Sequence, residues 1–300
     1  MAKLLSGKEV AENISAELNA RAEDLKARGY SPCLSVIRIG DRPGDCSYER
    51  GAVRRCETVG IKCMTHHLPK DVSQDELLSL IDELNGDESV HGVLLLRPLP
   101  RGMDEDLVVN RLRPEKDVDC MTDLSMSGLL SGGRNRFMPC TAEAAMAFFD
   151  YYGIDSTGMN AVIIGRSLVF GKPAALMLVN RNATVTVCHT RTRDLPSITR
   201  QADILITAAG HANTVTAEHV SPGQIVIDVG INAGEDGRLC GDAAFEDIKD
   251  IVGAITPVPG GVGAVTTSIL ARHVIEACEA AAGKRDNGNG LTEKEIYSAI

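Results

Sequence analysis

The stretch Ala161-Val-Ile-Ile-Gly-Arg-Ser-Leu-Val-Phe-Gly-Lys-Pro173 decides the fold class of this sequence. Its first four residues are an apolar, β-rich run that predicts a buried strand. Gly165 ends the run, and Gly171 and Pro173 follow where a helical pattern opens. A glycine turn of this kind lets a pyrophosphate approach the N–H groups at a helix N-terminus. The spacing is not G-x-G-x-x-G, so the turn alone does not identify a ligand.

Alternation of strands and helices continues on both sides of this stretch. Ser6 with Glu9, and Ser73 with Glu76, have the spacing of capping boxes, and Thr141 is the predicted N-cap of a linking helix that runs to Tyr152. Further strands are predicted at 33–39, 61–68, 93–96, 183–187, 203–207 and 224–229, and a long helix at 266–282. Such alternation predicts an α/β fold with parallel sheets.

Composition limits the class of protein. A chain of 300 residues suggests two domains, and 44% hydrophobic residues with 3% aromatics and no Trp predict aliphatic cores. The net charge of −10 argues against nucleic acid or an anionic membrane as a partner. We find no signal peptide and no apolar run long enough to span a membrane. Nine scattered cysteines, without a C-x-x-C pair or zinc spacing, predict reduced, mostly buried thiols, no metal site and a cytoplasmic location.

The strand that follows the glycine turn indicates which dinucleotide is bound. NAD-binding domains usually end this strand with an acidic residue that binds the ribose 2′-OH. Here Val187 precedes Cys188-His-Thr-Arg-Thr-Arg193, and the first acid is Asp194. Arg166, Thr190 and Arg191 suit a 2′-phosphate instead, which predicts NADP. The alternative is that these arginines are merely solvated.

Several motifs in order give the chain a family resemblance. They are Lys116-Asp-Val-Asp119, Pro139-Cys-Thr141, Gly165-Arg-Ser with Gly171-Lys-Pro173, Asn182-Ala-Thr-Val-Thr with Cys188-His189, and Ile255-Thr-Pro-Val-Pro-Gly-Gly-Val-Gly263. With them, residues 5–282 resemble the bifunctional methylenetetrahydrofolate dehydrogenase/cyclohydrolase family. The family oxidises 5,10-methylenetetrahydrofolate by hydride transfer and then hydrolyses the methenyl cation to 10-formyltetrahydrofolate.

The resemblance implies an organisation and a set of partners. Residues 1–140, completed by a C-terminal helix at 265–283, would bind folate. Residues 141–264 would form an NADP-binding Rossmann domain, the two domains would enclose a cleft, and 284–300 would be a polar tail. Tetrahydrofolate derivatives would be the substrates, and the protein would be a homodimer.

The resemblance also implies site residues, which extend the cofactor motifs above. Tyr48 and Asp119 take catalytic positions, although alone they would suggest helix packing and a turn. The implied substrate contacts are Tyr48, Leu96, Asp119, Pro259, Gly260 and Gly261. The implied cofactor contacts are Gly165, Arg166, Ser167, Gly171, Pro173, His189, Thr190, Arg191 and Ile231.

Two departures from the family concern this site. The family has a Lys four residues after the Tyr, and Ala52 stands there. A family Gln before Pro-Leu-Pro is replaced by Leu96. Asp45 and Ala264 also replace a family Ser and Pro.

The missing Lys affects the two reactions unequally. Hydrolysis needs protons moved by a group with a tunable pKa, and guanidinium groups such as those of Arg55 and Arg97 stay protonated. Hydride transfer needs mainly alignment of substrate and cofactor. We therefore expect a dehydrogenase whose cyclohydrolase activity is weak or lost. The alternatives are a bifunctional enzyme with a proton route through Arg55 or water, a non-catalytic folate- or NADP-binding homologue, and an NADP oxidoreductase with another substrate.

Overall fold

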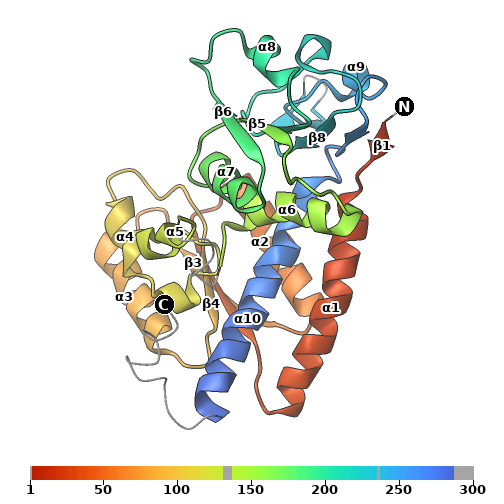
Figure 1. Ribbon diagram of the computed structural model, residues 1–300. Helices are drawn as coiled ribbons and strands as arrows, with labels where there is room; N and C mark the ends of the chain where they lie inside the picture. Colours follow the sequence, from red (N-terminus) through yellow and green to blue (C-terminus); the bar gives the residue numbers. More distant parts are fainter. Residues whose placement is uncertain (1, 131–136, 235–236, 287–300) are drawn as a thin grey trace. The chain divides into compact units, whose positions relative to one another are not determined.

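The computed structural model describes residues 2–130, 137–234 and 237–286, with side chains to residue 283 (Figure 1). It confirms the predicted α/β class with parallel sheets. Contacts divide the chain into two units, both discontinuous in sequence. The first unit comprises residues 1–15 and 119–269, and the second comprises 16–118 and 270–300. From residue 287 on, the predicted polar tail lies outside the described residues.

The first unit is built on a six-stranded parallel sheet of order β1-β11-β8-β7-β5-β6. The strands are β1 (Lys3–Leu4), β11 (Ala254–Ile255), β8 (Ile225–Asp228), β7 (Ile204–Thr207), β5 (Asn160–Ile164) and β6 (Thr184–Cys188). From β5 the chain first proceeds to β6 on one side and then returns to β7 on the other. This reversal is the topological switch point of a doubly wound sheet, where ligands bind at the carboxyl ends of the strands.

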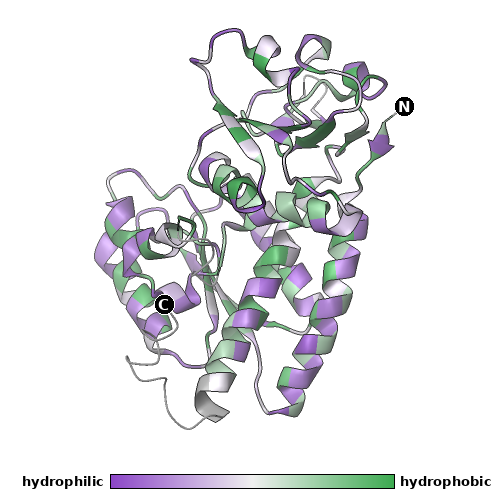
Figure 2. Cartoon of the chain, viewed as in Figure 1, coloured by the Kyte–Doolittle hydropathy of each residue, from purple (hydrophilic) through white to green (hydrophobic). Residues whose placement is uncertain are grey.

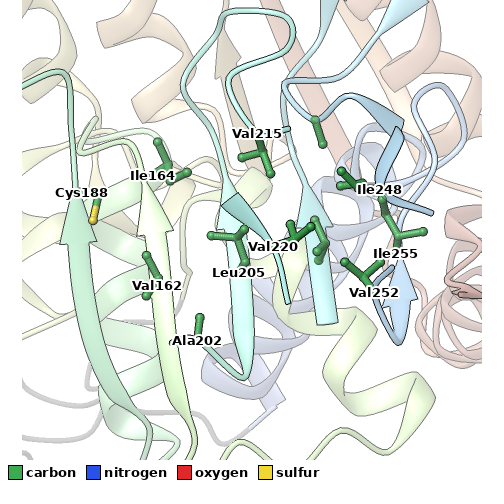
Figure 3. Packing of buried hydrophobic residues seen from close by; sticks show 12 residues of the cluster. Val162, Ile164, Cys188, Ala202, Leu205, Val215, Val220, Ile248, Val252 and Ile255 are labelled. Carbon is green, nitrogen blue, oxygen red and sulfur yellow. The ribbon is translucent and has the colours of Figure 1, made fainter. Parts of the chain in front are cut away.

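Short helices and a hairpin complete the first unit. The helices are α5 (Asp123–Ser127), α6 (Cys140–Tyr152), α7 (Gly171–Asn180), α8 (Leu195–Thr199) and α9 (Phe245–Ile248), with 3₁₀ turns η2 (Ala217–His219) and η3 (Val262–Ala264). Strands β9 (Asn232–Ala233) and β10 (Leu239–Cys240) pair antiparallel. The sheet core is aliphatic, as predicted: Val162 of β5, Leu205 of β7 and Ile255 of β11 project into one cluster (Figure 3). Their neighbours Ile163 and Ile206 are equally buried, so both faces of the central strands β5 and β7 are covered.

The second unit has a three-stranded parallel sheet of order β3-β2-β4. Its strands are β2 (Cys33–Ile39), β3 (Lys62–Leu68) and β4 (Gly92–Leu95), and its helices include α2 (Pro43–Thr58), α3 (Gln74–Gly86) and α4 (Glu105–Arg111), with the 3₁₀ turn η1 (Pro114–Lys116). Helices α1 (Gly7–Ala27) and α10 (Thr266–Asp286) lie side by side there, and Arg21 binds Glu279 between them at 2.7 and 2.9 Å (Figure 1). Figure 2 shows hydrophilic and hydrophobic residues alternating along α1, as expected for a half-covered helix.

Among the helix caps predicted from the sequence, one is confirmed and one is wrong. The capping box at Ser73 is confirmed, since its hydroxyl accepts from Glu76 N while the Glu76 carboxylate accepts from Ser73 N. The predicted cap at Thr141 is wrong: α6 begins at Cys140, after Pro139, which provides no side-chain cap. Instead, Asp119 Oδ1 accepts from Cys140 N at 3.3 Å. A carboxylate distant in sequence thus replaces the local cap.

All nine cysteines are free thiols, and six of them are buried, as the sequence predicted. Among the helices of the described residues, none is long and apolar enough to cross a membrane.

Two buried aspartates join the loops at the carboxyl edge of the first sheet. Asp228, at the end of β8, accepts backbone hydrogen bonds from Gly230, Asp242 and Ala243 at 2.8–3.0 Å. Asp242 in turn accepts from the backbone of Ala209 and Gly210 after β7. Burial raises the pKa of Asp228 to about 6, although these backbone donors oppose the rise.

This shift predicts a pH-dependent stability. Because the pKa of Asp228 is higher in the folded than in the unfolded chain, its protonation stabilises the fold below about pH 4, and this stabilisation is lost as pH rises through about 6. Between pH 5 and 8 the loss should be about 1–1.5 kcal/mol. Urea unfolding of the wild type and Asp228→Asn at both pH values measures it. The Asn variant should be less stable overall but should lack this component; identical pH dependence in both proteins would contradict the assignment.

Candidate active site

A pocket of about 340 Å³ lies at the switch point of the first unit. It is lined by the end of β5 and the turn after it, by residues following β6, and by residues following β7: Ile164, Gly165, Arg166, Ser167, His189, Thr190, Leu195, Ala208, Ala209, His211 and Thr214. The pocket is therefore where a doubly wound sheet binds its ligand.

The turn between β5 and α7 is made of close backbone contacts. Gly165 has φ +125°, which disfavours any side chain, and its N–H donates to Cys188 O at 2.9 Å. A Cβ at Gly171 would collide with the carbonyl oxygen of Gly165. Ser167 Oγ accepts from Phe170 N at 3.2 Å just before the helix begins. The N-terminus of α7 is thus held against the turn, an arrangement that suits a phosphate.

The segment after β6 is ordered by His189. The ring Nδ1 of His189 accepts from the backbone N–H of Arg191 at 3.1 Å, and the backbone N–H of His189 donates to Thr192 Oγ1 at 2.9 Å. Asp194, the first acid after the strand, caps α8 by accepting from Ser197 N. Its carboxylate is therefore engaged at a helix N-terminus.

A second pocket of the first unit, about 300 Å³, joins the loops after β8 and β11. Ile231, 60% exposed, shares it with the loop at Pro259, Gly260 and Gly261. Leu239 of the β9–β10 hairpin closes another side. This pocket is mainly apolar and backbone-lined, and it suits a flat ring better than a charged group.

Five of the nine predicted cofactor residues line the first pocket, namely Gly165, Arg166, Ser167, His189 and Thr190. Gly171 and Pro173 are buried in α7 behind the turn, Arg191 is exposed beyond it, and Ile231 lies in the second pocket. Sequence reasoning missed His211 and Thr214. The Ala-Ala-Gly run directly after β7 was the available signal, because parallel strands end at a common edge.

The predicted substrate residues are divided between the units. Asp119 and the Pro259–Gly261 loop belong to the first unit, and Tyr48 and Leu96 to the second. On α2, Tyr48 is half-buried and Ala52 is fully buried. Leu96 is 6% exposed just after β4, and its N–H donates to Ile37 O. Continuing the strand register by one residue places Leu96 beside Arg38 of β2.

The arginines near Leu96 and Ala52 differ in surroundings. Arg97 Nη1 donates to Glu105 Oε1 at 3.3 Å, while Arg55 is half-buried on α2. Sequence reasoning missed a third arginine, Arg38, which is buried beside α2 and paired with Glu49. In the described ranges, no group of three or more His, Cys, Asp or Glu side chains is arranged to hold a metal ion.

Both parts of the chain match models of one family. Residues 5–119 match the catalytic domain of tetrahydrofolate dehydrogenase/cyclohydrolase, and residues 139–282 match its NAD(P)-binding domain. A relative from Clostridium botulinum, "Bifunctional protein FolD", is 46% identical over 279 residues, covering 93% of this chain and 99% of its own.

Solved structures agree. The bifunctional FolD methylenetetrahydrofolate dehydrogenase/cyclohydrolase of Campylobacter jejuni has a TM-score of 0.91 and 41% identity, covering 93% of this chain and 99% of its own. The Trypanosoma brucei N5,N10-methylenetetrahydrofolate dehydrogenase-cyclohydrolase, solved with NADP cofactor and inhibitor, has a TM-score of 0.89 and 34% identity over 94% and 98%. With both domains matched and such relatives spanning nearly their full length, the chain belongs to the tetrahydrofolate dehydrogenase/cyclohydrolase family.

Proposed function

We propose that this protein is a cytoplasmic, NADP-dependent methylenetetrahydrofolate dehydrogenase of one-carbon metabolism, with weak or lost cyclohydrolase activity. The observation that carries the dehydrogenase is the switch-point pocket behind the Gly165 turn, within a family that performs this oxidation. Bound NADP supplies the hydride acceptor. The protein binds and aligns: residues 141–264 hold the cofactor, and residues 1–140 with 265–283 hold the folate.

The residues of the first pocket fit a phosphorylated dinucleotide. The glycine turn and the start of α7 offer backbone N–H groups to a pyrophosphate. Arg166 and Thr190 line the same pocket, and Asp194 is committed to capping α8. A guanidinium without a competing carboxylate favours a ribose 2′-phosphate over a free 2′-hydroxyl. Ile231 and the Pro259–Gly261 loop complete the proposed cofactor and folate contacts.

Arg166→Ala should raise the KM for NADP by about 10- to 100-fold, because a charge-assisted phosphate contact is lost. The KM for NAD should change little. Steady-state rates with each cofactor measure both values. Arg200→Ala is the matched control: Arg200 is an exposed arginine of the same unit, bonded to Glu218 O, and should affect neither KM. Equal use of NADP and NAD by the unmodified protein would contradict the proposal.

The weak hydrolase is supported by the surroundings of Ala52. Ala52 is fully buried, and its methyl group cannot take up or release a proton. Leu96 is an equally apolar replacement for the family Gln. Without the amine of the family lysine, water addition and ring opening lose that acid–base assistance. Tyr48 and Asp119 then serve the dehydrogenase as substrate contacts, with the Asp119 carboxylate suited to an amino-pyrimidine ring.

An alternative retains both activities. Relatives such as the Clostridium botulinum protein are named bifunctional, which supports retention of both activities. Because this chain lacks the family lysine, retention would need another proton route. Arg55 on α2 or an ordered water would then take part. The intact cofactor pocket argues against a non-catalytic homologue. An NADP oxidoreductase with another substrate would be favoured by Leu96, which makes the substrate side more apolar than the family Gln does.

The wild type should hydrolyse methenyltetrahydrofolate about 10²–10⁴-fold more slowly than a lysine-assisted site allows, while hydride transfer persists. Ala52→Lys with Leu96→Gln should raise the hydrolysis rate, because the amide helps set the pKa of the new amine. The decay of methenyl absorbance, corrected for spontaneous hydrolysis, measures this rate.

Ala52→Met with Leu96→Gln is the control for side-chain length without an amine. Enzymatic hydrolysis by the wild type as fast as its hydride transfer would establish the bifunctional alternative instead.

We further propose a homodimer in which edge strand β6 of the first unit meets a second copy. β6 ends the sheet, and Val187 on it and Val179 on α7 are 38% and 53% exposed. An exposed apolar edge is a natural pairing surface, and a two-fold axis would bury it twice.

Val187→Lys should therefore shift the protein from dimer to monomer in sedimentation velocity. Leu124→Lys, at a 64% exposed position on α5, should leave the dimer intact. A wild type that sediments as a monomer would refute the dimer.

A further inference from the structure

A buried ion cluster connects α2 to two strands of the second unit. Arg38 of β2 and Glu49 of α2 are each 8% exposed, and Arg38 Nε donates to Glu49 Oε2 at 2.6 Å. The other oxygen, Oε1, lies 2.7 Å from His67 Nε2 of β3, whose side chain is 52% exposed. One carboxylate of α2 thus holds both strands.

Other charged groups surround this cluster. Arg38 Nη1 also binds Asp41 Oδ1 at 2.6 Å and the carbonyl of Gly40. Lys70 and His67 act electrostatically on Asp41, and Cys46 of α2 acts on Arg38. Burial favours the neutral form of Glu49, but hydrogen bonds from His67 and Arg38 outweigh it and hold the pKa of this carboxyl below its usual range. Glu49 is therefore an anion held between two donors.

The fold alone does not require these charges. Removing a carboxylate and a guanidinium from water is costly, and well-packed apolar side chains often replace such a pair without loss of stability. A charge-assisted hydrogen bond is directional, whereas apolar packing is not. It therefore restricts the rotation of a helix about its own axis more tightly than apolar packing does. Glu49 directly follows Tyr48 and lies one turn before Ala52 on the same helix.

We propose that Glu49, held by Arg38 and His67, is a positioning residue that sets the orientation of Tyr48 towards the folate. The inference rests on the proposed role of Tyr48 as a substrate contact. The register strengthens it: His67 is the partner of Arg38 in the sheet, and Leu96 lies beside Arg38 on the other side. The three side chains form a row on the face that α2 covers.

The test uses the full-length protein and four variants. Arg38→Leu/Glu49→Leu replaces the buried pair with apolar side chains and should keep the fold. His67→Leu removes only the exposed donor, and His67→Gln restores a neutral donor. Arg111→Leu/Asp82→Leu is the control for losing an ion pair between two elements away from α2: this exposed pair, at 2.6 and 2.7 Å, joins α4 to α3 in the same unit.

The expected result is selective. The first double variant should raise the KM for methylenetetrahydrofolate about 10-fold or more, because small displacements of positioned groups are costly. The KM for NADP should not change, and His67→Gln should recover most of the smaller loss in His67→Leu. Hydrogen exchange of the α2 amides should accelerate in the double variant and not in the Arg111/Asp82 control.

An unchanged folate KM in the folded double variant overturns the proposal, even if its stability falls, because the pair would then be structural only. Failure of the unmodified protein to oxidise methylenetetrahydrofolate would refute the proposed function separately. In that case, hydrogen exchange of the α2 amides in the Arg38→Leu/Glu49→Leu variant would test whether Glu49 holds the helix in place. Faster exchange than in the wild type supports this role, and unchanged exchange overturns it.

Discussion

The backbone contact between Gly165 and Gly171 is the constraint on which the first unit depends. The carbonyl of Gly165 occupies the space that any side chain at position 171 would need. Strand β5 and helix α7 therefore meet at backbone distance, and the start of α7 faces the carboxyl edge of the sheet. A larger residue would move α7 outward and separate its N–H groups from the pocket. The groove at the switch point follows from this contact.

The chemistry proposed for the two reactions follows from what each unit provides. Hydride transfer takes its reactivity from a cofactor, so a rigid pocket and a well-oriented aromatic ring suffice. Hydrolysis depends on proton transfer, and the proposal of a weak hydrolase rests on the buried methyl group of Ala52, which stands where the family has an amine.

Local patterns predicted most of the elements. Continuous apolar runs located β2 to the residue and β5 to within one residue, because buried parallel strands leave little doubt about their bounds. Features that depend on residues distant in the sequence could not be predicted from local patterns. Pairing of Lys3 with Ala254 makes β1 a strand, and the carboxylate of Asp119 caps α6. Arg38 lies within the apolar run of β2, and nothing in the sequence around it indicates that the fold pairs it with Glu49 of α2.

Strand β1 also has a consequence for synthesis on the ribosome. Its partner β11 lies about 250 residues later in the chain, so Lys3 and Leu4 stay unpaired until residues Ala254 and Ile255 have been made. The second unit has the same delay, because α10 reaches it only after residue 270. Strands β2 to β4 pair over short separations and can form early. Until α10 has been made, the nascent chain therefore exposes the apolar surface that this helix covers, and such exposed surface is where chaperones bind.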